Sequence, residues 1–138
     1  MNKALRQRRT MRLSAVAALA LSLAVAPAVA FTPAINDVPW RVVEIEGTSA
    51  DEAGVLVFSR NQVGGQAACN RIMGRWTPTG TGHAFVQIAT TRMMCDEGKM
   101  AKERQLLKAM ERMQSFKHEG IVLTLLDGHG MPLVKLQQ

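Results

Sequence analysis

Short apolar stretches separated by polar, glycine- or proline-containing segments recur along most of the chain after residue 39. The stretch from Trp40 to Glu46 alternates over its second half and ends at Gly47, which is typical of a strand with one buried face. Other runs rich in β-forming residues follow between glycine- and proline-containing segments: 55–59, 72–77, 84–89, 115–119, 121–126 and 132–136. The pattern therefore predicts a chain dominated by short strands.

Glycines refine this picture at three places. The segment 62–70 contains Gly64 and Gly65 and predicts a turn that leads into a short strand. Gly74 inside the run 72–77 predicts a strand that bends or lets another backbone approach closely. The stretch 127–130, with the sequence Asp-Gly-His-Gly, is a strong hairpin signal between the last two strands.

One segment has a helical period instead. Between positions 96 and 113 the larger apolar residues fall near one face of a helix: Met100, Leu106, Leu107, Met110 and Met113. Asp96 and Glu97 stand at the expected N-terminus, where negative charge favours the helix dipole. We therefore expect one helix from about Asp96 to about Met113.

Seven or eight short strands and a single helix predict a mainly β fold of the α+β class. The pattern is typical of a small antiparallel β-barrel-like domain or a sandwich, with one packed α-helix. A parallel α/β fold would need helices between most of the strands, and the pattern indicates only one helix.

The first thirty residues differ from the rest. They carry five basic residues and no acidic one, followed by an apolar run over 13–26 and a small-residue Ala28-Val29-Ala30 pattern. These features predict a secretory signal peptide at 1–30, cleaved between Ala30 and Phe31. Arg8-Arg9 weakly resembles a twin-arginine signal, but the general secretory route is favoured. We expect a periplasmic domain at 31–138, with no stable membrane anchor after cleavage.

Removal of this leader changes the charge of the protein. The whole chain has 17 Lys and Arg against 11 Asp and Glu. Five of the basic residues lie in the leader, so twelve remain against eleven in a nearly neutral domain. Nucleic-acid binding, which needs a concentrated basic face, is therefore not expected. A domain of this size is expected to be a monomer.

Residues with catalytic or metal-binding chemistry are scattered. His83, His118 and His129 show no metal-ligand spacing, and no serine-elbow or phosphate-loop motif is present. Met93 and Met94 beside Cys95 are soft ligands of the kind that select Cu(I), although methionine more often fills cores. We predict no catalytic residue, no metal site and no cofactor.

The chain has two cysteines, Cys69 and Cys95. In an exported protein, two cysteines and no third favour one disulfide over two free thiols. Redox catalysis would be expected to show a C-x-x-C pair or a base beside the thiol, and neither is seen. A structural disulfide is therefore the favoured interpretation.

Several short motifs occur in a fixed order over residues 38 to 136. They are Trp40 at the start of a strand, Val63-Gly64-Gly65 before Cys69-Asn70, Gly74-Arg75-Trp76, Thr91-Arg92-Met93-Met94-Cys95, and Glu103 within the helix. This order resembles the META domain family, which includes the heat-shock protein HslJ. Ala68 and Trp76 stand where the family usually has glycine and tyrosine, and they keep a small and an aromatic residue there.

The resemblance implies a compact β-barrel-like domain with one helix and no established activity or cofactor. It implies structural roles for the family-motif residues Trp40, Gly65, Asn70, Gly74, Trp76, Thr91 and Met93. Members connected with heat stress and antibiotic tolerance suggest a non-enzymatic envelope stress-response or binding module, whose partner is an envelope protein or a small ligand. The alternative is a periplasmic thiol-redox or copper-handling protein using Cys69, Cys95 and Met93 or Met94.

Overall fold

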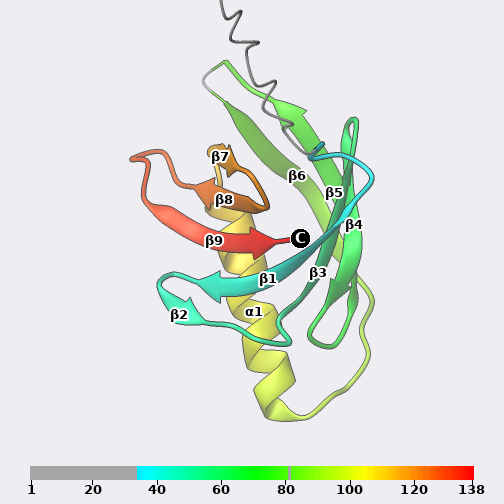
Figure 1. Ribbon diagram of the computed structural model, residues 1–138. Coiled ribbons are helices and arrows are strands. Elements are labelled where there is room, and N and C mark those ends of the chain that lie inside the picture. Colours follow the sequence, from blue (N-terminus) through cyan, green and yellow to red (C-terminus); the bar gives the residue numbers. More distant parts are fainter. Residues whose placement is uncertain (1–33, 81) are drawn as a thin grey trace, which may run out of the picture. The chain divides into compact units, whose positions relative to one another are not determined.

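The computed structural model describes residues 34–80 and 82–138, so the predicted signal peptide at 1–30 lies outside the described residues. Figure 1 shows the elements of the domain. In chain order they are β1 (Pro39–Ile45), β2 (Thr48–Ser49), β3 (Gly54–Ser59), β4 (Gln62–Ala67), β5 (Arg71–Pro78), β6 (His83–Thr90), α1 (Glu97–Arg112), β7 (Ser115–Glu119), β8 (Val122–Leu126) and β9 (Pro132–Gln137).

The strands form one sheet in the order β6-β5-β4-β3-β1-β9-β8-β7, with β2 paired to β1, and all named strands pair antiparallel. This confirms the predicted mainly β class with one helix. The sheet is not closed. Its two ends approach where the backbone N–H of His83 donates to the carbonyl oxygen of Gln114, 2.9 Å away. The predicted barrel-like form is therefore only approximate, because the sheet is curved but open.

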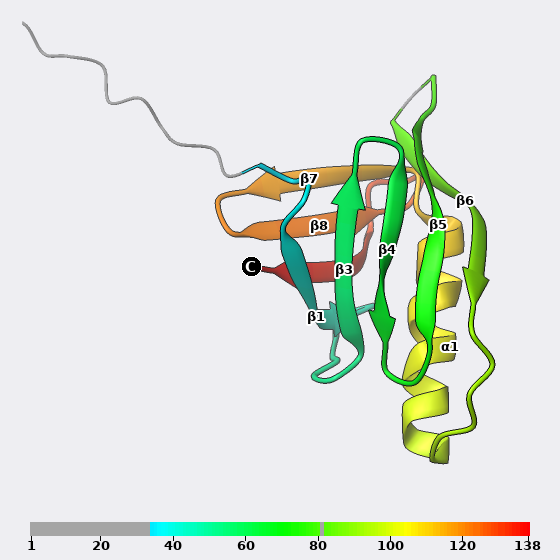
Figure 2. The same cartoon turned by 90° about the vertical axis from the view of Figure 1, so that its right-hand side faces the viewer.

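The sheet bends around the helix. α1 lies against β6 at one end of the strand order and against the neighbouring strands β1 and β9 nearer the other end (Figure 1). Seen from the side in Figure 2, β7, β8 and β9 run across the direction of β3, β4 and β5. The core fills the space between sheet and helix, and its largest fully buried side chains include Trp40, Phe58, Leu106, Met110 and Leu136.

Two strands differ from the sequence predictions. The segment 62–70 was predicted to be a turn that leads into a short strand, yet β4 already begins at Gln62 and pairs with both β3 and β5 through Gly64 and Gly65. Pairing on both sides outweighs the poor strand propensity of glycine. The sequence pattern also missed β2. Glu46 and Gly47 both have positive φ, so they form a tight turn that returns the chain beside β1.

The predicted helix is confirmed, with one correction to its buried face. The Asp96 side chain caps the helix by accepting a hydrogen bond from the backbone N–H of Lys99, 3.0 Å away. The buried residues of α1 are Glu103, Leu106, Ala109 and Met110. Met100 and Leu107, which were predicted on this face, are only half-buried, because the face that packs on the sheet is centred on the 103–106–110 line.

The hairpin predicted at 127–130 connects β8 and β9. The carboxylate of Asp127 accepts hydrogen bonds from the backbone N–H groups of Met131, at 2.9 Å, and His129, at 2.8 Å. These two bonds lower the pKa of Asp127 below its ordinary value, because they favour the charged form. Gly130 closes the turn at a φ of 78°.

Candidate functional site

The turn between β4 and β5 carries the first of the two cysteines. The backbone N–H of Ala67 donates to the carbonyl oxygen of Asn70 at 2.7 Å, and the Gln66 side chain donates to the carbonyl oxygen of Cys69 at 2.9 Å. These bonds satisfy polar groups of the turn and hold Cys69 and Asn70 in the interior, where they are 5% and 2% exposed. The turn therefore projects its middle residues toward the helix.

Glu103 of α1 receives this turn. One carboxylate oxygen, Oε2, accepts hydrogen bonds from the backbone N–H groups of Asn70 at 2.7 Å and Cys69 at 3.2 Å. The other, Oε1, accepts from the side-chain amide of Asn70 at 2.8 Å. Glu103 is 5% exposed. A buried carboxylate is costly unless it is hydrogen-bonded, and here three N–H donors supply those bonds.

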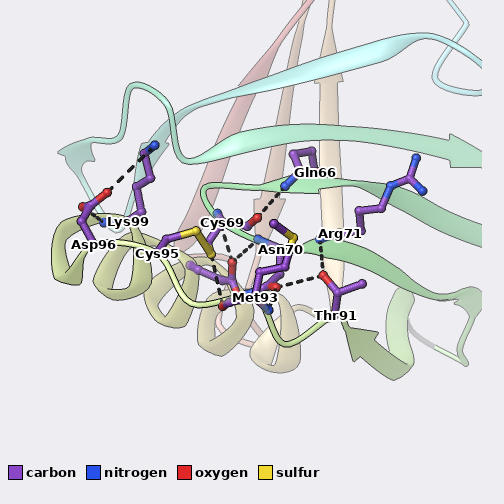
Figure 3. Close-up of a disulfide and its surroundings, with 10 residues drawn as sticks. Gln66, Cys69, Asn70, Arg71, Thr91, Met93, Cys95, Asp96 and Lys99 are labelled. Atoms are coloured by element: carbon purple, nitrogen blue, oxygen red, sulfur yellow. Dashed lines mark hydrogen bonds and ion pairs between the residues drawn. A yellow bond between two sulfur atoms is a disulfide. The ribbon is translucent and has the colours of Figure 1, made fainter.

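Asn70 passes the connection on to the segment after β6. Its side-chain oxygen accepts from the backbone N–H of Met93 at 2.6 Å and from the hydroxyl of Thr91 at 2.9 Å. The same hydroxyl accepts from the backbone N–H of Arg71 at 3.1 Å. Figure 3 shows Asn70 between the turn and the segment that carries Thr91 and Met93. One amide side chain thus links three separate parts of the chain.

The predicted disulfide between Cys69 and Cys95 is present, with the two Cα atoms 5.9 Å apart. It joins the β4–β5 turn to the residue before the helix cap (Figure 3). We call the residues joined by this bridge and these hydrogen bonds the disulfide cluster: Cys69, Asn70, Thr91, Met93, Cys95 and Glu103. No buried side-chain nitrogen or oxygen in the described part of the chain lacks a partner.

The other family-motif residues lie in the sheet. Trp40 is fully buried in β1, and its indole N–H donates to the carbonyl oxygen of Ile35 at 2.9 Å. Trp76 in β5 packs against Phe58 and Phe85, with ring centres 4.9 and 5.1 Å away. Gly74 lies opposite a register shift of β6, and a Cβ on it would be 3.4 Å from the Cα of Ile88, which matches the close backbone approach that was one of the two predictions there.

Gly65 and its neighbour Gly64 have different surroundings. Gly65 has a φ of 155°, and a Cβ on it would lie 2.1 Å from the carbonyl oxygen of Val55. The close approach of β3 therefore requires glycine at 65. A Cβ on Gly64 would meet nothing closer than 3.9 Å, so neither the backbone nor the packing requires glycine at 64.

The face of the sheet on which Gly64 lies is hollowed. A depression of about 670 Å³ is lined by residues of β3 to β6 and by Thr91, and a second of about 370 Å³ adjoins it. Both share Val57, Gly64 and Met73. We call the two together the sheet groove. It lies over the strands β3, β4 and β5, which run side by side in Figure 2.

The floor of the sheet groove is apolar and its ends are basic. Met73 is 67% exposed and Val55 37% exposed, so apolar side chains of neighbouring strands face solvent together. Arg71 lines the first depression and Arg75 lines the second. No acidic residue lines either depression. Within residues 34–80 and 82–138, neither guanidinium forms an ion pair. Figure 3 shows the Arg71 side chain pointing away from the disulfide.

The residues considered for redox or metal chemistry lie in two settings, the disulfide and the exposed segment before it. Both cysteines are joined, so no free thiol is present among the described residues. Met93 and Met94 are 60% and 94% exposed. Over the described ranges, no three His, Cys, Asp or Glu side chains come together as a metal site. The single described helix is not of the length and hydrophobicity that crossing a membrane requires.

Sequence reasoning missed two features of this region. Glu103 was noted only as a motif residue within the helix, although its spacing from Leu106 and Met110 places it on their buried face. A charged residue on an apolar helix face is a signal for a buried polar contact. The sheet groove was missed because it depends on which strands pair, and on Gly64 and Met73 being neighbours in adjacent strands.

Comparisons with known proteins agree on the fold. The sequence model of the META domain matches residues 33–138. No curated protein matches the chain. A solution structure of a protein from Burkholderia xenovorans is 17% identical over 75% of this chain and 82% of its own, with a TM-score of 0.58. A crystal structure of a DUF4847 family protein from Bacteroides vulgatus is 12% identical over 75% and 93%, with a TM-score of 0.57.

Proposed function

The chain belongs to the META domain family, and we propose that it is an exported, non-enzymatic binding module of the bacterial envelope whose ligand-contacting surface is the sheet groove. The observation that carries the proposal is the contrast on β4 between Gly65, which the fold requires, and Gly64, which it does not. Neither the backbone conformation nor the packing requires glycine at position 64. Its missing side chain instead keeps the centre of the apolar hollow open. An open apolar pocket with a few polar groups is the usual form of a binding site.

Export is supported by two further features. The leader at 1–30 has the basic, apolar and small-residue regions of a signal peptide. The bridge between Cys69 and Cys95 suits an oxidising compartment such as the periplasm. A role in the response to heat or antibiotics follows from the resemblance to the family and forms part of the same proposal.

The chemistry of the disulfide cluster supports a non-enzymatic role. Its carboxylate and its amide are engaged in hydrogen bonds to the chain itself, and its sulfurs are joined. A general base needs a proton of a substrate within hydrogen-bond reach, and a nucleophilic thiol needs a free sulfur. The cluster is better suited to holding the end of the groove in place.

A site-specific photocrosslinker tests this proposal in cells. The crosslinking residue replaces Met73 in the groove or Ile121, which is 52% exposed in the β7–β8 turn and serves as control. We expect the protein in the envelope fraction, with an intact mass that corresponds to a chain starting at Phe31. Crosslinks at position 73 should increase under heat or antibiotic stress. A cytoplasmic full-length protein, or equal crosslinking at both positions, would contradict the proposal.

A further inference from the structure

We infer that the sheet groove binds a free single-chain amphiphile with an anionic head group, such as a fatty acid carboxylate. This inference rests on the proposed function, since it names the ligand class of the same surface. It is carried by the arrangement of apolar and basic residues across four neighbouring strands.

The apolar part of the groove is a strip that crosses the strands. Val57 of β3 is paired with Gly64 of β4, Gly64 with Met73 of β5, and Met73 with Ala89 of β6. Neighbouring strands are about 4.8 Å apart, so the strip is about 14 Å long. Because Gly64 has no side chain, the centre of the strip is low. This length and shape suit one extended alkyl chain.

The two arginines flank the strip. Arg71 lies two residues before Met73 on β5 and Arg75 two residues after it, so their side chains are on the same face. At about 3.3 Å per residue, the Cα atom of each arginine is about 7 Å along β5 from that of Met73. Both are exposed and have no ion pair within the described ranges. An anionic head group at the end of the strip formed by Met73 and Ala89 is therefore within reach of one of them.

The charges also distinguish between possible occupants. No acidic residue lines the groove, so a cationic ligand would meet only like charge. A second copy of this chain, docked through the same face about a two-fold axis, would bring the same arginines toward each other. A fatty acid matches both features of the groove. Its carboxylate pairs with a guanidinium group, and its alkyl chain covers the apolar floor.

The purified domain 31–138 with its disulfide intact tests the inference. Decanoate, kept below its aggregation concentration, is titrated while the methyl signal of Met73 and the backbone amides of β4 and β5 are followed by NMR. We expect saturable shifts confined to the groove, and weaker binding at higher salt. Decyltrimethylammonium, which has the same chain and the opposite charge, is expected to bind at least about fivefold more weakly.

Variants separate the two parts of the site. Gly64→Leu fills the strip and is expected to abolish the decanoate shifts, and Met73→Glu is expected to do so by repulsion. The double variant Arg71→Gln with Arg75→Gln should lose about fivefold in affinity. Arg60→Gln, an exposed arginine in the β3–β4 turn that does not line the groove, is the matched control and should bind normally. Unchanged core amide shifts show that each variant is folded.

Three results would overturn the inference. Equal binding of decanoate and decyltrimethylammonium would remove the role of the arginines. Groove shifts that depend on protein concentration alone would identify a second copy as the occupant. Co-sedimentation with phosphatidylglycerol vesicles, without any shift on adding decanoate, would point to a membrane surface. In each case the crosslinking at position 73 in cells is measured separately, so the proposed binding role is judged on its own evidence.

Discussion

The disulfide cluster and the sheet groove meet at consecutive residues, yet they are built in opposite ways. Asn70 is 2% exposed, and its side chain and backbone bond to Glu103, Thr91 and Met93. Arg71, the next residue, is exposed at the end of the groove with no ion pair in the described ranges. In the cluster, every buried side-chain nitrogen and oxygen has a partner within the described residues. In the groove, apolar and cationic groups face solvent.

This difference separates residues that the fold needs from residues that the fold leaves free. Buried polar groups are retained when they are fully hydrogen-bonded, and they then fix the local arrangement of the chain. Exposed apolar side chains beside unpaired charges contribute little to stability, so they suggest contact with something outside the chain. Substitutions in the two regions should therefore differ in kind, with loss of stability in the cluster and loss of binding in the groove.

The two adjacent glycines of β4 give the largest expected contrast. Gly65→Ala places a Cβ 2.1 Å from the carbonyl oxygen of Val55, so β3 and β4 must separate. We expect a loss of about 4 kcal/mol in the free energy of unfolding, whereas Gly64→Ala should stay within about 0.5 kcal/mol of the parent. Urea unfolding of both variants measures this. Similar losses at 64 and 65 would remove the argument that Gly64 serves the groove.

Removal of the buried carboxylate comes next. Glu103→Ala leaves the N–H groups of Cys69 and Asn70 without their acceptor. Because unsatisfied buried donors keep their full desolvation cost, we expect a loss of about 3 to 4 kcal/mol. The control is Glu111→Ala, an exposed glutamate on the same helix, which should change stability by less than about 0.5 kcal/mol. Equal stabilities for the two variants would show that the cluster does not hold the fold.

The covalent part of the cluster is tested by Cys69→Ala with Cys95→Ala. Opening a loop of this length should cost about 3 kcal/mol by the chain-entropy argument. The hydrogen bonds around Asn70 do not need the bridge, so the folded double variant should keep its core amide shifts and its decanoate binding. Urea unfolding with and without reductant checks the first point. A parent whose stability is insensitive to complete reduction would contradict the structural role of the bridge.

The sequence predicted the strands, the helix and the bridge because these depend on local periodicity and on cysteine count. The stretch 40–46, which alternates over its second half, and the β-forming run 55–59 correspond to β1 and β3. It predicted β4 poorly, since the two glycines there are held by pairing with strands on both sides. The buried role of Glu103 depends on a turn 33 residues away, and the groove depends on register across four strands. Neither is encoded in a local pattern.

The rim of the disulfide cluster offers the smallest and most specific contrast, because Asp96 follows Cys95 but lies exposed at the start of the helix. The hydrogen bond from the backbone N–H of Lys99, with the nearby charge of Lys99, lowers the pKa of Asp96 below its ordinary value. A lowered pKa in the folded state gives stability that is present above the unfolded value and lost as pH falls through the folded one. Asp96→Asn keeps a capping oxygen but cannot titrate. The parent should therefore be slightly more stable than this variant at pH 7, and the difference in melting temperature should vanish as pH falls below the lowered pKa. Asp127 titrates in both proteins, so its contribution cancels.

Salt should reduce the stability difference between the parent and Asp96→Asn, since the Asp96 carboxylate is exposed. The effect of Glu103→Ala, inside the cluster, should be nearly independent of salt. A difference that persists at low pH would assign the effect of Asp96 to cap geometry and not to its charge.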